Sequence, residues 1–562
     1  MSSWQRCCAC ATAALLLLPL TGLAAEVGDH LNVPGAPRPD FLPPKPAETF
    51  ELPPVGPSSV PSQAGPSAQV RIDRVVFRGN TVLPESELTA IAAPYVGRMV
   101  SASELEDLRQ KLTRYYVDRG YVNSGVLLAE VSADNAAVFD VVEGRLTAVR
   151  LRGMERLNEN YVARRFLRDA DRPLNLDVLR ERFQILLNDP LFDRMNARLL
   201  PDVRAGEAIL DIDVVRARPY QLSAFFNNYR PPSIGSESLG LSGWVRNLTG
   251  QGDMLEASLQ ASPKETDTAR GTLGWRMPLG YSGTFLSVAT EHGRSSVIEE
   301  SLRALNIRST LTSVDAGLGQ TLFESLAQKL TLGLNRVYRE NRSFLLDAPF
   351  SFVAGEPEGV TREDLWRFWQ EYSYRTETYV VAFRSTFTFG KNNIQDIAGL
   401  PLATPERRFQ IWLGQAQFAR QVMANGAQLI VRGTTQQTED RLVPLDGISV
   451  GGVYTVRGYV ENQLVRDVGE ILNVEFEYPL VRSAGAGLNV ALIPFYDYGR
   501  ARNNGGSAAS ISSLGLASRL RWQGLSVDIA IAKRLSHPDF INGPKENLQE
   551  KGIHFQLSYN FF

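Results

Sequence analysis

The sequence predicts two small α+β domains followed by a sixteen-stranded antiparallel transmembrane β-barrel. Three observations lead to this fold class: an export signal at the N-terminus, two consecutive segments with the same order of strands and helices, and a long C-terminal part that alternates polar and apolar residues at period two. The expected boundaries are 1–25 for a signal peptide, 26–68 for a proline-rich linker, 69–144 and 145–218 for the two small domains, and 219–562 for the barrel.

Charge and hydropathy exclude several classes of protein. The chain has 59 Lys+Arg and 61 Asp+Glu, a formal net charge of −2, so no basic excess favours a nucleic-acid partner. It contains no apolar run of about 18 residues, the length that a transmembrane helix requires. The strands of a transmembrane barrel need only about ten residues of alternating polarity, and such strands remain compatible with this composition.

The first 25 residues have the pattern of a secretory signal peptide. Arg6 precedes a short apolar stretch over 11–20, and small residues follow at 22–25. All three cysteines of the chain, Cys7, Cys8 and Cys10, lie inside this segment, so the mature protein is expected to be exported without disulfides. The next segment has eleven prolines between Pro34 and Pro66, which predicts an extended linker.

Two segments then follow one plan of strand, helix, helix, strand and strand. In the first, strands are predicted at 70–77, 121–130 and 136–143, a short helix at 84–92, and a longer helix that opens with Ser101 and Glu104 in capping-box spacing. The apolar face of this longer helix is predicted to be Leu105, Leu108, Leu112 and Tyr115. An open three-stranded sheet leaves an edge strand, to which another chain can add a strand.

The second segment repeats this order. Strands are predicted at 146–152, 195–201 and 208–215, with a short helix at 158–167 and a longer helix capped by Asn175. The apolar face of that helix is predicted to be Leu176, Leu179, Phe183, Leu186 and Leu187.

From residue 219 onward the chain alternates apolar and polar residues, and short connections alternate with long ones. Brief turns such as 280–283 and 523–524 alternate with long connections such as 391–406 and 442–467. Short turns at one end and long loops at the other are typical of outer-membrane barrels. The last predicted strand places Ile553, Phe555, Leu557, Tyr559 and Phe561 on one face before Phe562, whose terminal aromatic ring is the expected assembly signal.

Two motifs link the barrel to a known family. Val456-Arg457-Gly458-Tyr459 lies in a long loop, and Phe495-Tyr496-Asp497-Tyr498-Gly499 lies in a following strand. With the signal peptide, the linker and the two small domains, they resemble the two-partner secretion transporters (TpsB type), the haemolysin secretion/activation and filamentous-adhesin transporter family of the POTRA-barrel superfamily. The start of the barrel, at 226–230 and 247–253, is also similar to that family.

The resemblance implies a function and a location. It implies POTRA domains in the periplasm, a barrel in the outer membrane, and export of one large β-helical exoprotein of the haemolysin or adhesin type without ATP. Expected partners are that exoprotein, outer-membrane lipid and the barrel-assembly machinery during biogenesis, with the chain acting as a monomer. Family members commonly carry a pore-plugging helix, but Glu26 to Phe41 is interrupted by three prolines, which makes a plug helix doubtful here.

Two other functions remain open at this point. A barrel-assembly or insertion factor would share the same parts, although it usually carries more than two periplasmic domains. A passive porin would need no periplasmic domain at all.

The alternation of the two strands that follow the motif loop predicts a buried ion pair. Asp497 falls on the lumen side of its strand, and Glu475 and Glu477 fall on the lumen side of the preceding strand. Because a guanidinium can bind a carboxylate through two parallel hydrogen bonds, a loop that folds inward would pair Arg457 with Asp497, or alternatively with Glu475 or Glu477. Gly458 would allow a close backbone approach, and Tyr459 could stack or donate a hydrogen bond.

The remaining motif matches lack the context that their chemistry requires. Gly447-Ile448-Ser449-Val450-Gly451 fits a nucleophile-elbow pattern but lies in a barrel loop instead of a strand-to-helix turn. The four histidines have no metal-ligand spacing, and no phosphate-binding glycine loop occurs. We therefore expect no enzyme activity, no cofactor and no metal site.

Overall fold

The computed structural model describes residues 41, 50–51, 69–263, 268–397, 404–483, 485–536 and 547–561. The expected signal peptide, the plug region apart from Phe41, most of the linker and Phe562 lie outside the described residues. The described chain forms two compact units: an N-terminal unit up to Pro219, which also includes Gly250–Gly252, and a C-terminal unit that consists of the other described residues from Tyr220 onward together with Phe41. No described helix is long and apolar enough to span a membrane.

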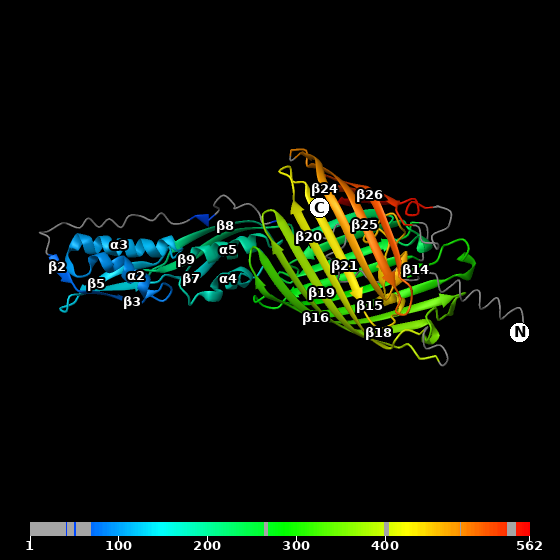
Figure 1. The fold of residues 1–562 in the computed structure, drawn as a ribbon, viewed down its shortest axis with the longest axis horizontal. Coiled ribbons are helices and arrows are strands. Elements are labelled where there is room, and N and C mark those ends of the chain that lie inside the picture. The colour runs from blue at the N-terminus through cyan, green and yellow to red at the C-terminus, as the bar shows by residue number, and fades with distance from the viewer. Residues whose placement is uncertain are drawn as a thin grey trace, which may run out of the picture. The chain divides into compact units, whose positions relative to one another are not determined.

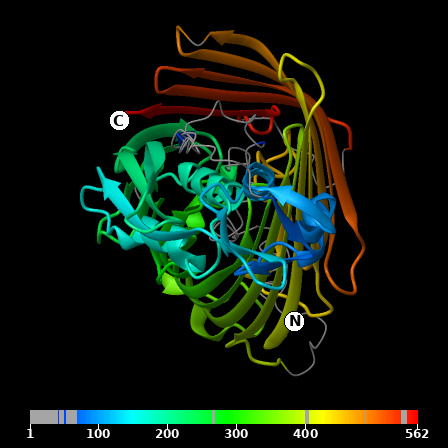
Figure 2. The ribbon, with the colours of Figure 1, turned by 90° about the vertical axis from the view of Figure 1, so that its left-hand side faces the viewer.

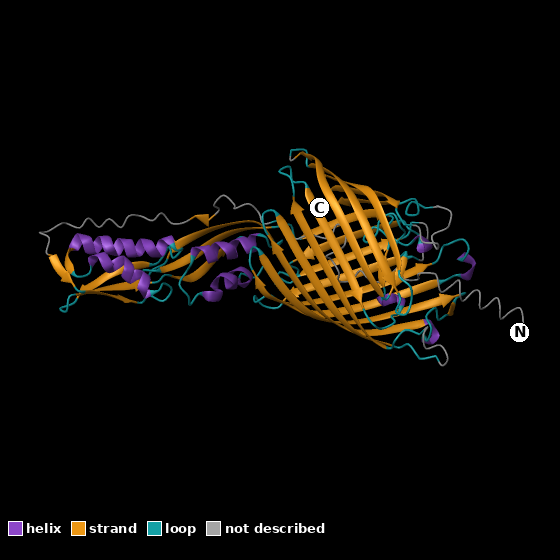
Figure 3. Cartoon of the chain, viewed as in Figure 1, coloured by secondary structure: helices purple, strands orange, loops and turns teal. Residues whose placement is uncertain are grey.

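The N-terminal unit contains two mixed sheets of the same design, with the described α-helices α2 to α5 (purple in Figure 3). In the first sheet the strand order is β3-β6-β5, with β3 parallel and β5 antiparallel to β6. In the second sheet β7 is parallel and β8 antiparallel to β9, which repeats the plan. The elements are β2 (Gln69–Ile72), β3 (Arg74–Arg78), α2 (Glu85–Ala92), β4 (Arg98–Ser101), α3 (Ala102–Asp118), β5 (Gly125–Val131), β6 (Ala136–Val142), β7 (Arg145–Arg152), α4 (Asn160–Phe166), α5 (Leu176–Leu187), β8 (Phe192–Pro201) and β9 (Glu207–Arg216).

The structure corrects two details of the first sheet. The strand predicted over 70–77 is divided at Asp73 into β2 and β3, and β2 pairs with β4, a strand between the two helices that the sequence analysis did not predict. The residue that completes the buried face of α3 is Tyr116, fully buried, and not Tyr115. Tyr115 is partly buried against the same core, and its hydroxyl donates a hydrogen bond to Glu87.

Both long helices begin at the residues that the sequence predicts. The Ser101 side chain accepts from the Glu104 amide, and the Glu104 carboxylate accepts from the Ser101 amide, which completes a capping box. The Ser101 amide, the Arg98 guanidinium and the Ser101 hydroxyl all donate to the Glu104 carboxylate and lower its pKa to about 2. The side chain of Asn175 accepts from the amides of the first turn of α5.

The two sheets differ at one edge. The two-residue strand β1 (Phe50–Glu51) pairs in parallel with β8. In the first sheet, β5 occupies the position that corresponds to β8, and among the described residues it pairs with β6 alone. The outer edge of β5 is therefore open to strand addition.

The C-terminal unit is a closed antiparallel barrel of sixteen long strands within the described residues (Figure 1). The red strand β28 lies beside β10 and closes the ring (Figure 2). The strands are β10 (Tyr220–Asn227), β11 (Ser238–Arg246), β12 (Met254–Ala261), β13 (Ala269–Pro278), β14 (Thr284–Ser296), β15 (Arg308–Glu324), β16 (Gln328–Leu345), β18 (Val360–Arg375), β19 (Tyr379–Asn392), β20 (Arg408–Gln421), β21 (Gln428–Gln437), β24 (Val468–Ser483), β25 (Leu488–Arg502), β26 (Ala509–Trp522), β27 (Leu525–Arg534) and β28 (Ile553–Asn560).

The connections confirm the expected contrast between the two ends of the barrel. Turns as short as Gln523-Gly524 join strands at the end where Tyr220 begins, and longer loops join them at the other end. The longest loop, 438–467, contains the short strands β22 (Ile448–Val450) and β23 (Leu464–Arg466), which pair with each other. The two-residue strand β17 (Ala348–Pro349) lies in the loop between β16 and β18.

We expect Ser101→Ala to destabilise the start of α3 by about 1 kcal/mol, the usual cost of losing a polar N-cap. Hydrogen exchange of the amides of residues 102–118 in the full chain should be faster than in the wild type. Ser103→Ala, a substitution two positions later on the exposed side of the same turn, is the control and should have a smaller effect. Equal exchange in the two variants would contradict the capping role.

Candidate functional site

The candidate site is the contact between loop 438–467 and the inner wall of the barrel. The loop contributes the motif Val456 to Tyr459, and the wall contributes side chains of β24 and β25 that point inward. Along β24, Ile471, Asn473 and Glu475 are buried and alternate with more exposed neighbours. The loop therefore lies against the lumen face of these two strands.

Arg457 is buried between two carboxylates. Its Nε and Nη2 atoms donate to Oδ2 and Oδ1 of Asp497, each at 2.8 Å, in the two-bond geometry of an arginine–carboxylate pair. Its Nη1 atom lies 2.8 Å from Oε1 of Glu475. The exposed fractions of Arg457, Glu475 and Asp497 are 5%, 4% and 0%, so these charges interact almost without screening by water.

The structure thus brings together Arg457, Asp497 and one of the two alternative partners. Glu477 does not reach the loop: it pairs with Arg519 at 2.8 Å and accepts from Gln428. Both glutamates lie on the inner side of β24 in the structure, but Glu477 is two residues further along the strand, towards the end with the short turns.

Asp497 accepts two further hydrogen bonds that hold the backbone of the loop. The Arg457 amide donates to Oδ2 at 3.0 Å, and Asn473 Nδ2 donates to Oδ1 at 2.8 Å. Asn473 also donates to the carbonyl of Thr455 at 2.5 Å, so it links Asp497 of the wall to the backbone of the loop. Burying a carboxylate is costly unless its oxygens are satisfied, and here both oxygens have two donors.

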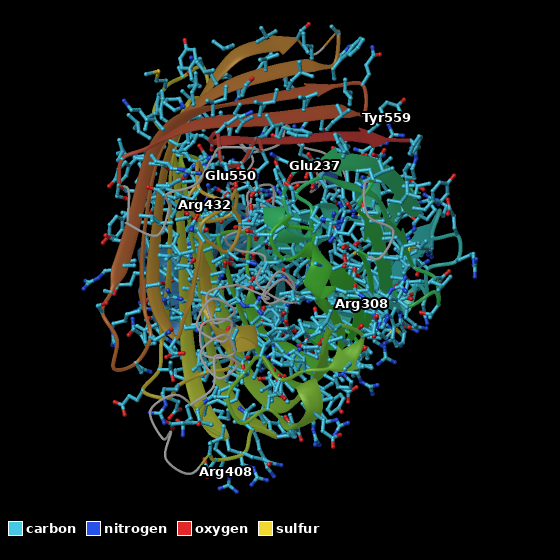
Figure 4. All side chains as sticks on the ribbon, turned by 90° about the vertical axis from the view of Figure 1, so that its right-hand side faces the viewer. Glu237, Arg308, Arg408, Arg432, Glu550 and Tyr559 are labelled. Carbon is cyan, nitrogen blue, oxygen red and sulfur yellow. The ribbon has the colours of Figure 1, made fainter. Side chains whose placement is uncertain are left out.

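Phe495 and Arg432 complete the surroundings of the ion pairs. The guanidinium carbon of Arg457 lies 3.5 Å from the ring centre of Phe495, a cation–π contact. Arg432 of β21 donates to Glu475 at 2.5 Å, so Glu475 lies between two arginines. Arg432, labelled in Figure 4, lies within the ring of strands. The sequence analysis missed Arg432. Alternation along β21 could have placed it on the lumen face, but its position opposite Asn473 depends on the register of β21 and β24.

Gly458 and Tyr459 anchor the tip of the loop to strands on the other side of Asp497. Gly458 has φ +93°, its amide donates to His554 Nε2 at 3.1 Å, and its carbonyl accepts from Arg534 Nε at 2.6 Å. The Tyr459 hydroxyl is 3.0 Å from the carbonyl of Ser512 and 2.5 Å from that of Ser536. These partners belong to the last three strands and the loops that join them, so the tip is attached to several strands at once.

Val456 packs in an apolar cluster between the loop and the wall. The cluster joins β22 and β23 to β24, β25 and β26 through Ile448, Val450, Val456, Tyr459, Leu464, Ile471, Ala501 and Ile511. Gly499 makes this approach possible: a Cβ atom there would lie 2.2 Å from Cγ1 of Val450 and 2.9 Å from Cγ2 of Val456. The absence of a side chain at the end of the second motif is therefore required by the loop.

A second ion cluster holds the other end of the loop at a different part of the wall. Arg339 of β16 donates to Asp446, which precedes β22, and lies 2.9 Å from Glu363 of β18. The Arg339 side chain is 9% exposed, and those of Glu363 and Asp446 are 0% and 3% exposed. Nothing in the sequence predicted this pair, because its partners are 107 residues apart and share no motif.

No cluster of three or more metal-ligating side chains occurs among the described residues. The sites in the described barrel are built from arginines, carboxylates and amides that already bind one another.

The chain was compared with known proteins. Residues 206–522 match the family described as haemolysin secretion/activation protein ShlB/FhaC/HecB, and residues 70–144 match the POTRA domain of ShlB type. The chain belongs to the haemolysin secretion/activation family. This confirms the predicted resemblance, and it also confirms that the chain is a transport protein of the outer membrane, with periplasmic POTRA domains, and not an enzyme.

Curated relatives and solved structures agree with this family. The chain is 23% identical over 238 residues to the outer membrane transporter CdiB of Dickeya dadantii (strain 3937), and 26% identical over 201 residues to the heme/hemopexin transporter protein HuxB of Haemophilus influenzae (strain 86-028NP). These matches span 42% and 35% of the two relatives, and the same shares of this chain. The structure of CdiB from Escherichia coli has a TM-score of 0.69 at 19% identity, with 90% of this chain and 93% of that chain covered, and so has the same fold.

We expect Arg457→Ala to release the loop from the wall. The substitution leaves Asp497 and Glu475 buried without their shared cation, a loss of about 3 to 5 kcal/mol for a buried pair. The measurement is limited proteolysis of the outer-membrane protein, with new cleavage expected between Leu442 and Asp467.

Asp497→Ala should have a smaller effect than Arg457→Ala, because Arg457 keeps its contact with Glu475. The double variant should be little worse than Arg457→Ala alone, since both substitutions remove the same interaction. Glu477→Gln, which changes an inward carboxylate that does not touch the loop, is the control. Additive effects of the two substitutions, or full loop protection in Arg457→Ala, would refute the pairing.

A further prediction concerns Gly499. We expect Gly499→Ala to displace the loop, because the new methyl group overlaps Val450 and Val456, at a cost of about 1 to 3 kcal/mol. The same proteolysis assay and the thermal unfolding of the barrel measure the effect. Gly433→Ala on β21 is the matched control, since the nearest atom to its added Cβ is 4.0 Å away. If the two variants behave alike, the close approach at Gly499 does not hold the loop.

Proposed function

We propose that this protein recognises one large exoprotein in the periplasm through its POTRA domains and exports it through its β-barrel without ATP. The observation that carries the proposal is loop 438–467, which lies in the lumen and is held there by buried ion pairs at Arg457 and Asp446. Side chains that form hydrogen bonds and ion pairs can exchange partners without covalent chemistry. A loop held in this way can be displaced by a passing polypeptide and then return.

The substrate that we propose is a β-helical protein of the haemolysin or adhesin type, as the family resemblance implies. When such a chain folds into repeated β-strands outside the cell, the free energy of folding can drive its export, so no ATP is needed. A barrel-assembly factor has a similar architecture, but membership of the haemolysin secretion/activation family favours export.

We place the recognition surface on the outer edge of β5. Among the described residues this edge has no partner strand, whereas β1 pairs with β8, the corresponding strand of the second sheet. Leu127 and Leu128 of β5 are exposed, at 53% and 37%, and give an incoming strand apolar side chains to contact. A strand of the exoprotein added here would gain backbone hydrogen bonds together with these side-chain contacts.

Ala129 offers a sharp test of this docking. It is the residue at which the register between β5 and β6 shifts, so it pairs with no residue of β6, and a proline is tolerated at such a bulge. We expect Ala129→Pro to weaken binding of the exoprotein about tenfold, because it removes a backbone donor from the edge and obstructs the added strand.

The assay measures exoprotein in the medium and in the periplasm of cells that produce the variants at equal outer-membrane levels. Ala129→Ser retains the amide and serves as the control, with export expected at the wild-type level. Export by Ala129→Pro equal to that of Ala129→Ser would rule out docking at this edge. Deletion of residues 70–143 should abolish export and leave the barrel folded. Continued export by that variant would exclude any docking role for the first domain.

A further inference from the structure

Five cations gather on the outer face of neighbouring barrel strands, four of them near the end with the long loops. They are Arg336 and Arg342 of β16, Arg362 of β18, Lys391 of β19 and Arg408 of β20, here called the outer basic cluster. The side chains of Arg336, Arg342 and Arg362 are 59%, 54% and 53% exposed. Each alternates along its strand with buried residues that face the lumen, so all five point away from the barrel interior. Arg408, labelled in Figure 4, lies at the periphery of the ring.

The strand register places these cations side by side. Arg408 is opposite Lys391, Lys391 is opposite Asp364, and Arg362 is opposite Glu340. Neighbouring strands are about 4.8 Å apart, so the whole cluster lies within a few strand spacings. A multivalent anion of modest size can therefore reach several of these side chains at once.

The cluster contains fewer carboxylates than cations, so it has an excess of positive charge. Glu340 pairs with both Arg342 and Arg362 at 2.7 Å, and Asp364 pairs with Arg336 at 2.8 Å. Five cations and two carboxylates give a net charge of +3 on this patch. Both carboxylates already bind arginine, so an added anion would face a positive surface.

Aromatic side chains lie directly beside the cluster, on the side towards the middle of the barrel wall. Trp366 is opposite both Arg336 and Phe389 in the register, and Phe368 and Phe387 form the next row. Trp366 is 45% and Phe389 is 49% exposed on the outer surface. Such aromatic rings mark the boundary between lipid tails and headgroups, so the adjacent cations lie at headgroup level.

The cluster belongs to the outer leaflet. The barrel begins at Tyr220, directly after the periplasmic domains, and Tyr220 lies at the end with the short turns. Arg342, Arg362, Lys391 and Arg408 are near the opposite end of their strands, which places them on the cell-surface side, and Arg336 lies midway along β16. The lipids of that leaflet are glycolipids that carry phosphate groups.

A cavity of about 600 Å³ adjoins the cluster at the end of β19 and β20. Its lining includes four cations, Lys391, Arg407, Arg408 and Arg441, and two carboxylates, Asp396 and Glu406. Arginine binds phosphate oxygens through paired hydrogen bonds, so a phosphorylated sugar has both space and donors at this position.

From these observations we propose that the outer basic cluster binds the phosphorylated headgroup of an outer-leaflet glycolipid. On β24 and β25 the exposed outward charges Glu470 and Arg500 lie opposite each other and carry no net charge. The glycolipid would thus bind to the wall formed by β16 to β20 with higher affinity than to the wall formed by β24 and β25.

The test measures binding of diphosphoryl lipid A to the full-length protein in phosphatidylcholine nanodiscs. We expect the triple variant Arg362→Ala, Lys391→Ala and Arg408→Ala to bind about tenfold more weakly, since each cation near a membrane surface contributes to attraction of an anionic headgroup. Arg500→Ala, which removes an outward arginine from the other side of the barrel, should bind as the wild type does. Triple-variant affinity equal to that of Arg500→Ala would overturn the proposal.

Two further measurements test the proposal independently of the triple variant. Glu340→Gln removes a carboxylate from the cluster and should increase the affinity for diphosphoryl lipid A. This measurement tests the proposal even if the triple variant fails to fold. An unchanged or lower affinity would count against the cluster. Inorganic phosphate at equal phosphate concentration should not displace the lipid, and if it does, the cluster is a site for free phosphate and not for a headgroup. None of these measurements depends on export of an exoprotein.

Discussion

The fold of the long loop depends on a guanidinium that is buried between two carboxylates. Arg457 of the loop could not remain buried against the lumen wall without Asp497 and Glu475, because burying an unpaired charge away from water is costly. Neither carboxylate could remain buried there without a cation. The loop and the wall are therefore stable only as a pair, and the surrounding hydrogen bonds from Asn473 and the Arg457 amide orient that pair.

Apolar packing and backbone geometry follow from this ion pair. Once Arg457 is seated, Val456 is directed into the cluster formed with β22 to β26, and Gly458 must take a positive φ to reach Arg534 and His554. Gly499 leaves the space that Val450 and Val456 occupy. Asp446 and Arg339 hold the loop at a second part of the wall, so the loop has two separate polar attachments.

Such attachments suit the transport proposed above, in which the loop is held in the lumen and then displaced. Buried ion pairs contribute specificity of position more reliably than net stability, since their desolvation offsets much of their attraction. A purely apolar contact of the same size would hold the loop by non-directional packing and would not select one arrangement. The open edge of β5 and the outer basic cluster are the surfaces proposed above for other contacts, and Arg441 of the loop lines the cavity beside that cluster.

The sequence by itself determined the architecture, because alternation, capping residues and loop lengths are local patterns. It also placed Asp497 and Glu475 on the lumen face and singled out Arg457. Only the tertiary structure decided that Arg457 contacts both acids, that Glu477 binds Arg519 instead, and that Arg432 and the Arg339–Asp446 pair take part. These choices depend on the register between strands and on the depth to which the loop folds. Both are set by contacts between residues far apart in the chain, and no local pattern records them.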